Sequence, residues 1–403
     1  MTLGSLHREP LPPAPAYGTG SIGEVLTSAA ASLGVDGFTN ELKLPSARRI
    51  CVVMVDGLGR ELLKRRGGHA PFLRSHLDAG LTLSSAFPST TAASLATLGT
   101  GRPPGQHGMV GYDVLDPEQL KVVNMLNAWD AGVDPLRWQP YPTVLERVNA
   151  SLPVITVSEG RFADSPMTKA ALRGGQFIAA GSVQARVRTA VEQLAAHESI
   201  LMYVYLNDLD KAGHRYGCDS SEWVSRLEDL DAALRSLASR VPPDTLLLVT
   251  ADHGMVDVPA EQRIDFSAEP GLVDGVAYTA GEPRMVHLYC EDGLPELARE
   301  RLRSRWQQAY GPQAWILTRG EAISAGYFGA VDEGVRPRIG DLIIAAREPV
   351  AFYDLRRVSA TALEMVGQHG SLTRAEREVP LLTLNTPPRQ RNRTTPVGTG
   401  ARG

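Results

Sequence analysis

The chain alternates between short, continuous apolar runs and longer segments in which apolar residues recur every three or four positions. The continuous runs, rich in β-branched residues, predict buried strands at 47–55, 81–87, 153–158, 199–206, 244–250 and 379–384. The amphipathic spacing predicts helices at 22–33, 60–66, 143–150, 181–196 and 222–241. Because strands and helices alternate, we expect an α/β fold, with a mostly parallel central sheet and helices on both of its faces.

The composition shifts after Val256, where a second, smaller unit is predicted. Alternating and apolar segments predict further strands and helices at 284–290, 294–309, 314–318, 319–325 and 340–346. We expect an inserted, cap-like α+β subdomain over 258–348, between a catalytic core at 22–257 and its return at 349–386. The remaining segments are a loose, Pro-rich N-terminal arm at 1–21 and a tail at 387–403 with the composition of a disordered end.

Charge and cysteine content exclude several classes of protein. The net charge of −4 on 403 residues gives no bias toward nucleic-acid polymers or anionic membranes. Cys51, Cys218 and Cys290 are too few and too irregularly spaced for a disulfide scaffold or a CxxC metal site. With neither a signal-peptide pattern nor an apolar run of about 20 residues, we expect a cytoplasmic protein without a membrane anchor. The sequence does not indicate an oligomeric state.

Acidic and histidine side chains follow several of the predicted strands. Asp56 ends the first apolar run, Asp210 and His214 stand four apart in a Gly-containing loop after 199–206, and Asp252-His253 follows 244–250. Each of these residues alone fits an ordinary cap or surface position. The carboxyl ends of parallel strands, however, are where open α/β sheets bind ligands.

His369, in G-Q-H-G, completes a set of three carboxylates and three imidazoles, enough to hold two divalent ions. A mixed set of oxygen and nitrogen ligands suits Zn²⁺, Mn²⁺ or iron better than Mg²⁺ or Ca²⁺. His107, in a Gly-flanked turn, is expected to be structural instead. Trp129 and Trp138 either wall a substrate pocket or, as we favour, pack in the core.

Thr90 and Thr91 stand between an apolar run and a segment of small helix formers. A threonine in this position can cap the free N–H groups of the helix. It can also act as a nucleophile whose developing charge those groups favour.

Five motifs occur in one order along the chain: V-D-G-L-G around Asp56, P-S-T-T-A-A-S around Thr91, D-x-x-x-H-x-x-G from Asp210, A-D-H-G-M at Asp252, and G-x-H-G at His369. In order and spacing they resemble the alkaline phosphatase superfamily, specifically its nucleotide pyrophosphatase/phosphodiesterase branch. The resemblance covers residues 50 to 371 and implies a phosphoric ester hydrolase with two zinc ions, Mn²⁺ being the alternative. It implies the following ligands: Asp56, Asp252, His253 and the Thr91 oxygen for one ion, and Asp210, His214 and His369 for the other.

The same resemblance makes Thr91 the nucleophile toward a small phosphorylated substrate. Relatives that hydrolyse nucleotides commonly carry an aromatic residue and an asparagine where this chain has Ala92 and Ser94, so nucleotide specificity stays open, and Ser94 becomes a candidate phosphate contact. The absence of an arginine beside Thr91 favours phosphodiester or pyrophosphate substrates. The alternatives are a phosphomonoesterase, a phosphonate hydrolase or a manganese-dependent phosphomutase of the same superfamily, and, outside it, a non-catalytic metal-stabilised binding protein.

Overall fold

The computed structural model describes residues 11–126, 129 and 132–385. Its centre is a seven-stranded sheet in the order β2-β17-β8-β1-β7-β5-β6. Strand β17 runs antiparallel to its neighbours β2 and β8, and the other adjacent pairs are parallel. The predicted mostly parallel α/β sheet is therefore confirmed. Its strands are β1 (Arg49–Val55), β2 (Leu81–Ser84), β5 (Val154–Ser158), β6 (Gln176–Ala179), β7 (Ile200–Leu206), β8 (Thr245–Thr250) and β17 (Glu378–Asn385).

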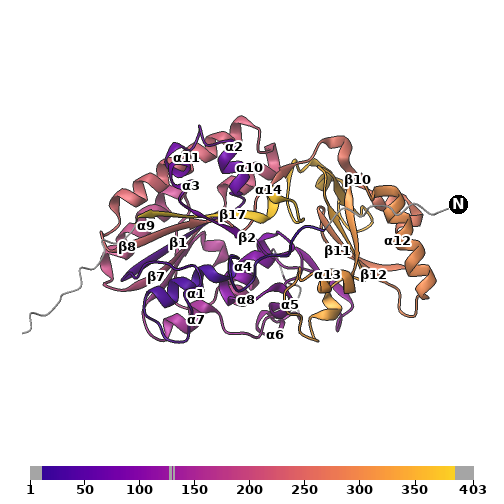
Figure 1. Ribbon diagram of the computed structural model, residues 1–403, viewed down its shortest axis with the longest axis horizontal. Coiled ribbons are helices and arrows are strands. Elements are labelled where there is room, and N and C mark those ends of the chain that lie inside the picture. Colours follow the sequence, from indigo (N-terminus) through magenta and orange to yellow (C-terminus); the bar gives the residue numbers. More distant parts are fainter. Residues whose placement is uncertain (1–10, 127–128, 130–131, 386–403) are drawn as a thin grey trace, which may run out of the picture.

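Helices cover both faces of this sheet (Figure 1). One face carries α1 (Gly23–Ser32), α4 (Thr91–Thr100), α7 (Val144–Asn149) and α8 (Pro166–Ala171). The other carries α2 (Arg60–Arg65), α3 (Pro71–Leu77), α9 (Val183–Ala196), α10 (Asp208–Tyr216) and α11 (Ser221–Arg240). Every residue of β7 and β8 is buried between these layers, which explains why both strands read as continuous apolar runs.

A second, four-stranded antiparallel sheet lies at one end of the molecule, in the order β11-β12-β14-β13 (Figure 1). With its helices it comprises β11 (Val276–Glu282), β12 (Met285–Cys290), α12 (Glu296–Tyr310), β13 (Ala314–Thr318), α13 (Arg319–Ser324) and β14 (Leu342–Ala346). A separate apolar cluster around the fully buried Trp306 fills it. These elements fall within the predicted insertion, whose boundaries stay a prediction.

Short elements connect the two sheets. They are α5 (Pro104–His107), the hairpin β3 (Asp113–Asp116) and β4 (Lys121–Asn124), α6 (Pro135–Trp138), the pair β9 (Val256–Asp257) and β16 (Gly367–Gln368), the pair β10 (Arg263–Asp265) and β15 (Ala351–Tyr353), and α14 (Arg374–Arg377). The β3–β4 hairpin packs on β11 and β12, where Leu115 forms a small apolar cluster with Ala280 of β11 and Tyr289 of β12.

The N-terminal arm differs from the expected loose segment where the structure describes it. The Tyr17 hydroxyl donates to the carbonyl of Tyr327 (3.0 Å) and accepts the N–H of Phe87 (3.0 Å). Tyr327 in turn donates to the carbonyl of Pro12 (2.8 Å). These tertiary bonds hold a Pro-rich stretch that has no local pattern of its own. The predicted tail lies outside the described residues, as do residues 1–10 of the arm.

Within the described ranges, every helix is too short or too polar to span a lipid bilayer.

Candidate metal centre

Three adjacent parallel strands bring the three carboxylates together. Strands β8, β1 and β7 are neighbours in the sheet. Asp56 directly follows β1, Asp252 comes two residues after β8, and Asp210 lies in the first turn of α10, after β7. Because the strands point the same way, their carboxyl ends place these side chains at one edge, as the sequence predicts.

Asp210 and His214 lie on a helix, not in the predicted loop. Gly213, which suggested a loop, lies inside α10 (Asp208–Tyr216). A Cβ at this glycine would come within 2.4 Å of the Met255 sulfur, so packing requires the small residue. On a helix, residues four apart share a face, and the Asp210 Oδ1 lies 3.4 Å from the His214 Nε2.

The first ligand cluster consists of Asp56, Asp252 and His253, whose ligand atoms all lie within 4.8 Å of one another. The His253 Nε2 is 3.4 Å from Asp56 Oδ1 and 3.5 Å from Asp252 Oδ2. The other oxygen of Asp252 accepts the backbone N–H groups of Gly57 (3.1 Å) and His253 (3.0 Å), which fixes its carboxylate. The Thr91 Oγ1 lies 3.1 Å from the same His253 nitrogen.

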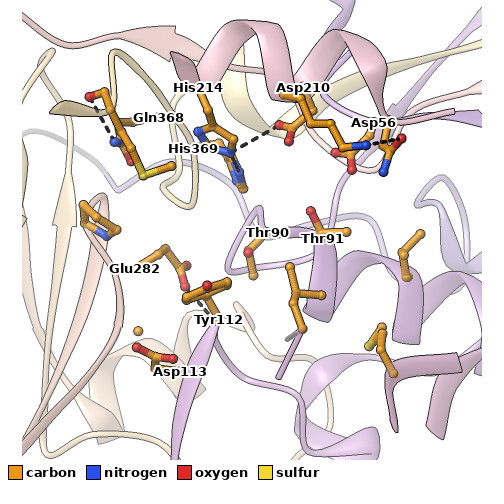
Figure 2. A pocket seen from close by; sticks show the side chains of 18 of the residues that line it. Asp56, Thr90, Thr91, Tyr112, Asp113, Asp210, His214, Glu282, Gln368 and His369 are labelled. Atoms are coloured by element: carbon orange, nitrogen blue, oxygen red, sulfur yellow. Dashed lines mark hydrogen bonds and ion pairs between the residues drawn. The ribbon is translucent and has the colours of Figure 1, made fainter. Parts of the chain in front are cut away.

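The second cluster lies next to the first and shares His253 with it. Ligand atoms of Asp210, His253 and His369 fall within 4.8 Å of one another. The His214 Nε2 is 3.3 Å from the His369 Nε2, and the rings of His253 and His369 stack with centroids 3.5 Å apart. All seven predicted ligand residues therefore converge on one place. Figure 2 shows His214, His369, Asp210 and Asp56 along one side of the pocket, with Thr90 and Thr91 opposite.

Each histidine of the centre is oriented by a backbone carbonyl. The Nδ1 of His253 contacts the Gly254 carbonyl (2.9 Å), that of His214 the Gly367 carbonyl (2.7 Å), and that of His369 the Ser89 carbonyl (2.9 Å). A carbonyl only accepts, so each Nδ1 carries the proton and each Nε2 turns a lone pair toward the cluster. This is the arrangement in which histidine ligates a metal ion.

The carboxylates of the centre are short of hydrogen-bond donors. Asp56 Oδ1, Asp210 Oδ1 and Asp252 Oδ2 are buried without a partner. Burial, followed by the charges of Asp210 and Asp252, raises the pKa of Asp56 well above its ordinary value. Burial, followed by His253 and His214, lowers the pKa of His369. Buried oxygens without donors, facing imidazole lone pairs, fit divalent cations.

Thr91 is the hydroxyl that faces the cluster. It is the first residue of α4, and Thr90 precedes it as the N-cap without a side-chain cap bond. Thr90 Oγ1 is buried and has no partner, whereas Thr91 Oγ1 contacts His253. Of the two hydroxyls, that of Thr91 is therefore the one in contact with a histidine of the centre.

Gly254, in the A-D-H-G motif, is required by close packing. A Cβ at this position would lie 1.8 Å from the carbonyl oxygen of Ala375. Its N–H donates to the carbonyl of Glu376 (2.7 Å). This close approach fixes the backbone immediately after His253.

The centre opens into a cavity of about 510 Å³ between the main sheet and the four-stranded unit. Ser94, a candidate phosphate contact in the sequence, does not line it. One turn along α4 from Thr91, it is fully buried, and its hydroxyl lies 3.0 Å from the Ser85 hydroxyl. Ser85 donates to the Asp252 carbonyl (2.6 Å), so Ser94 supports the site from behind and does not face the cavity.

Tyr203 and Tyr205 also line the cavity, in addition to the site residues that the sequence predicts. The Tyr205 hydroxyl donates to Asp56 Oδ2. A signal for both was present in the sequence, because residues two apart on a strand share a face and both lie near the end of β7. Trp129 and Trp138 pack edge to face with ring centroids 5.6 Å apart, outside the cavity lining, as the core interpretation predicts.

Comparisons with known proteins show which family the chain resembles in sequence and in fold. The sequence model described as type I phosphodiesterase / nucleotide pyrophosphatase matches residues 50–372. A phosphopentomutase of Anaeromyxobacter dehalogenans (strain 2CP-C) is 37% identical over 117 residues, which are 28% of this chain and 28% of that protein. The match thus spans just over a quarter of that relative.

Two solved structures share the fold at low sequence identity. Murine ectonucleotide pyrophosphatase/phosphodiesterase 5, as an inactive threonine-to-alanine variant with AMP, has a TM-score of 0.66 at 17% identity, covering 84% of this chain and 88% of that one. Phosphonoacetate hydrolase of Sinorhizobium meliloti 1021, with phosphonoacetate, has a TM-score of 0.66 at 21% identity, covering 87% and 93%. Since the family model spans most of the chain, including all seven residues of the centre, the protein belongs to the type I phosphodiesterase / nucleotide pyrophosphatase family.

Proposed function

We propose that the protein is a metal-dependent hydrolase of phosphodiester or pyrophosphate bonds, with Thr91 as its nucleophile. The observation that carries this proposal is the convergence of three inward imidazole nitrogens and three partnerless carboxylate oxygens beside one hydroxyl. Structural carboxylates and histidines normally satisfy their polar atoms with protein partners, whereas these leave them free at one point.

Two divalent ions, which we propose to be zinc, fit the donor set, with manganese as the alternative. Asp56, Asp252, His253 and the Thr91 oxygen would hold one. Asp210, His214 and His369 would hold the other. When bound, such ions lower the pKa of a coordinated oxygen and offset the charge that develops on the oxygens around phosphorus.

The chain's own residues supply the rest of the reaction. The Thr91 oxygen attacks phosphorus, so that the Thr91–phosphorus bond forms as the bond to the leaving oxygen breaks. Water then cleaves the phosphothreonine and restores the hydroxyl. At the start of α4 the first N–H groups have no intrahelical partner and can donate to the phosphoryl oxygens.

The cations of the cavity favour a substrate with a single negative charge on the reacting phosphorus. Arg161 and Lys211, which line it, both pair with Glu159, at 3.0 and 2.8 Å. Arg357 pairs with Asp113. Every lysine and arginine of the described lining therefore already pairs with a carboxylate. None of them is dedicated to neutralising the second negative charge of a phosphomonoester.

A phosphonate hydrolase is the second candidate, because phosphonoacetate hydrolase shares the fold as well as the pyrophosphatase does. The two differ in the bond broken, which is phosphorus to carbon in a phosphonate and phosphorus to oxygen in an ester. Product analysis therefore separates them.

Thr91→Ala and Thr90→Ala, each loaded with zinc, test the proposal. We expect Thr91→Ala to lower kcat for bis(4-nitrophenyl) phosphate at least about 1,000-fold while the protein keeps two zinc ions by elemental analysis. Thr90→Ala, the neighbouring control, should lose far less. Activity of Thr91→Ala within a few-fold of wild type would show that Thr91 is not the nucleophile. If the wild-type protein hydrolysed phosphonates and no phosphate esters, phosphonate hydrolysis would take the place of the proposed ester reaction.

A further inference from the structure

A buried ion pair joins the four-stranded unit to the loops that carry two of the histidines. Arg284 lies in the turn between β11 and β12, and Glu376 lies in α14. The Arg284 Nε and Nη2 donate to Glu376 Oε1 and Oε2 at 3.0 and 2.7 Å. Their side chains are 1% and 0% exposed, so the pair is fully removed from water.

Glu376 contacts both histidine loops. Its Oε1 also accepts the N–H of Ser371 (3.0 Å), two residues after His369. Its backbone carbonyl accepts the N–H of Gly254 (2.7 Å), directly after His253. One residue therefore holds the backbone beside two ligands whose rings stack on each other.

Arg284 fixes Glu376 from the other side. Its Nη1 donates to the carbonyls of Glu348 (2.5 Å) and Val350 (2.9 Å), which anchors the guanidinium in the segment that leaves the four-stranded unit. The fork of the guanidinium thus sets both the position and the rotation of the Glu376 carboxylate. A lysine could make only one such bond at a time with the same geometry.

We propose that Arg284 and Glu376 are a positioning pair, through which the four-stranded unit holds His253 and His369 at the spacing that the metal ions require. This inference rests on the metal centre of the proposed function. It gives the four-stranded unit a role in metal affinity in addition to covering the cavity. Groups that orient metal ligands in this way typically contribute 10- to 100-fold in affinity.

Arg284→Lys tests the pair, because it keeps the buried charge and removes the fork. The full chain is stripped of metal, and its Zn²⁺ affinity is measured by competition with a chromophoric chelator. We expect affinity to fall by about 10- to 100-fold. The visible spectrum of the Co²⁺-loaded variant should also change, because the spectrum reports the ligand geometry of the bound ion.

A second arginine–carboxylate pair in the same unit supplies a control for the loss of an ion pair. Arg303 on α12 pairs with Glu321 on α13 away from both histidine loops, its Nη2 alone donating to the two carboxylate oxygens at 2.7 and 2.8 Å. The side chains of this pair are 17% and 35% exposed. Arg303→Lys should change Zn²⁺ affinity less than about threefold and leave the Co²⁺ spectrum as in wild type. An equal loss in Arg303→Lys would show a general loosening of the unit and overturn the positioning role.

A double variant covers the case in which Arg284→Lys does not fold. Arg284→Met with Glu376→Gln removes both charges and so leaves no unpaired ion in the interior. It should also bind Zn²⁺ at least about tenfold more weakly than wild type. Wild-type affinity in the folded variants would overturn the inference and leave the proposed function standing, whereas a wild-type protein that binds no metal would overturn the proposed function itself.

Discussion

Replacing Asp56 by asparagine should stabilise the metal-free protein and destabilise the metal-loaded one. Asp56 is 3% exposed, and its partnerless Oδ1 lies 3.4 Å from the Nε2 of His253. An asparagine has the same shape and no charge. Its amide can donate to His253, and its oxygen can still accept from the Tyr205 hydroxyl.

The magnitude follows from the spacing of the carboxylates. Ligand atoms of Asp56 and Asp252 lie within 4.8 Å, where two unit charges repel by about 3.5 kcal/mol at an effective dielectric constant of about 20. Exchanging the charge-assisted bond from Tyr205 for a neutral one costs about 1 kcal/mol. Without metal we therefore expect Asp56→Asn to raise the free energy of unfolding by about 2 to 3 kcal/mol.

The gain should depend on pH. The folded-state pKa of Asp56 is raised, so the cost of ionising it is absent below the ordinary carboxyl pKa and grows as the pH rises. Asp56→Asn should therefore stabilise more at about pH 8 than at about pH 5.

With metal the sign reverses. Free zinc at about 1,000 times its Kd stabilises a folded protein by about 4 kcal/mol per site. Asparagine is a poorer ligand than a carboxylate, so the variant should lose much of that stabilisation.

Urea unfolding, followed by far-UV circular dichroism in EDTA and in excess Zn²⁺, measures both effects. Asp231→Asn is the control, because Asp231 is 4% exposed and accepts the N–H groups of Leu73 (2.8 Å) and Phe72 (3.2 Å). The control should lower stability in both solutions. If Asp56→Asn also lowers stability in EDTA, the argument that these carboxylates repel one another when no cation is bound is refuted.

Three further changes test other parts of the structure. Tyr205→Phe removes a donor to Asp56 and should weaken Zn²⁺ binding about tenfold in chelator competition; unchanged affinity would contradict this. Burial lowers the pKa of His287 to about 4, so the folded protein holds this histidine neutral. Its contribution to the free energy of unfolding is therefore complete above about pH 6.5, the pKa of an ordinary histidine. As the pH falls below that value, the free energy of unfolding decreases by up to about 1.4 kcal/mol per pH unit. His287→Gln should flatten that slope in urea titrations in EDTA, and an unchanged slope would assign it to other groups. Gly254→Ala would place a Cβ 1.8 Å from the Ala375 carbonyl and should cost about 3 kcal/mol, seen as a lower Tm; an unchanged Tm would mean that the backbone yields easily.

The parts that could be predicted from sequence are those with a local signature. Strands β1, β7 and β8 are continuous apolar runs in the sequence. Asp56 and Asp252 follow β1 and β8 in the structure, as the sequence predicts. His107 also follows its predicted structural role, since it is fully buried with its Nε2 3.0 Å from the Thr97 hydroxyl.

Other features depend on contacts between segments that are separated in the sequence. Asp210 and His214 lie on a helix that contains Gly213, and this glycine packs closely against Met255. The bond from Tyr205 to Asp56 depends on the register of β1 with β7. The ion pair of Arg284 with Glu376 joins residues 92 positions apart, which no periodicity connects.

The sequence by itself determined the fold class, the strands that end in acidic residues, and the order of motifs that marks the family. Tertiary structure alone decided that β8, β1 and β7 are neighbours and that the Thr91 and His369 loops close over their ends. The reason is physical. Burial and backbone geometry leave a periodic trace within a segment, whereas the pairing of distant strands and loops depends on packing free energy summed over the whole chain.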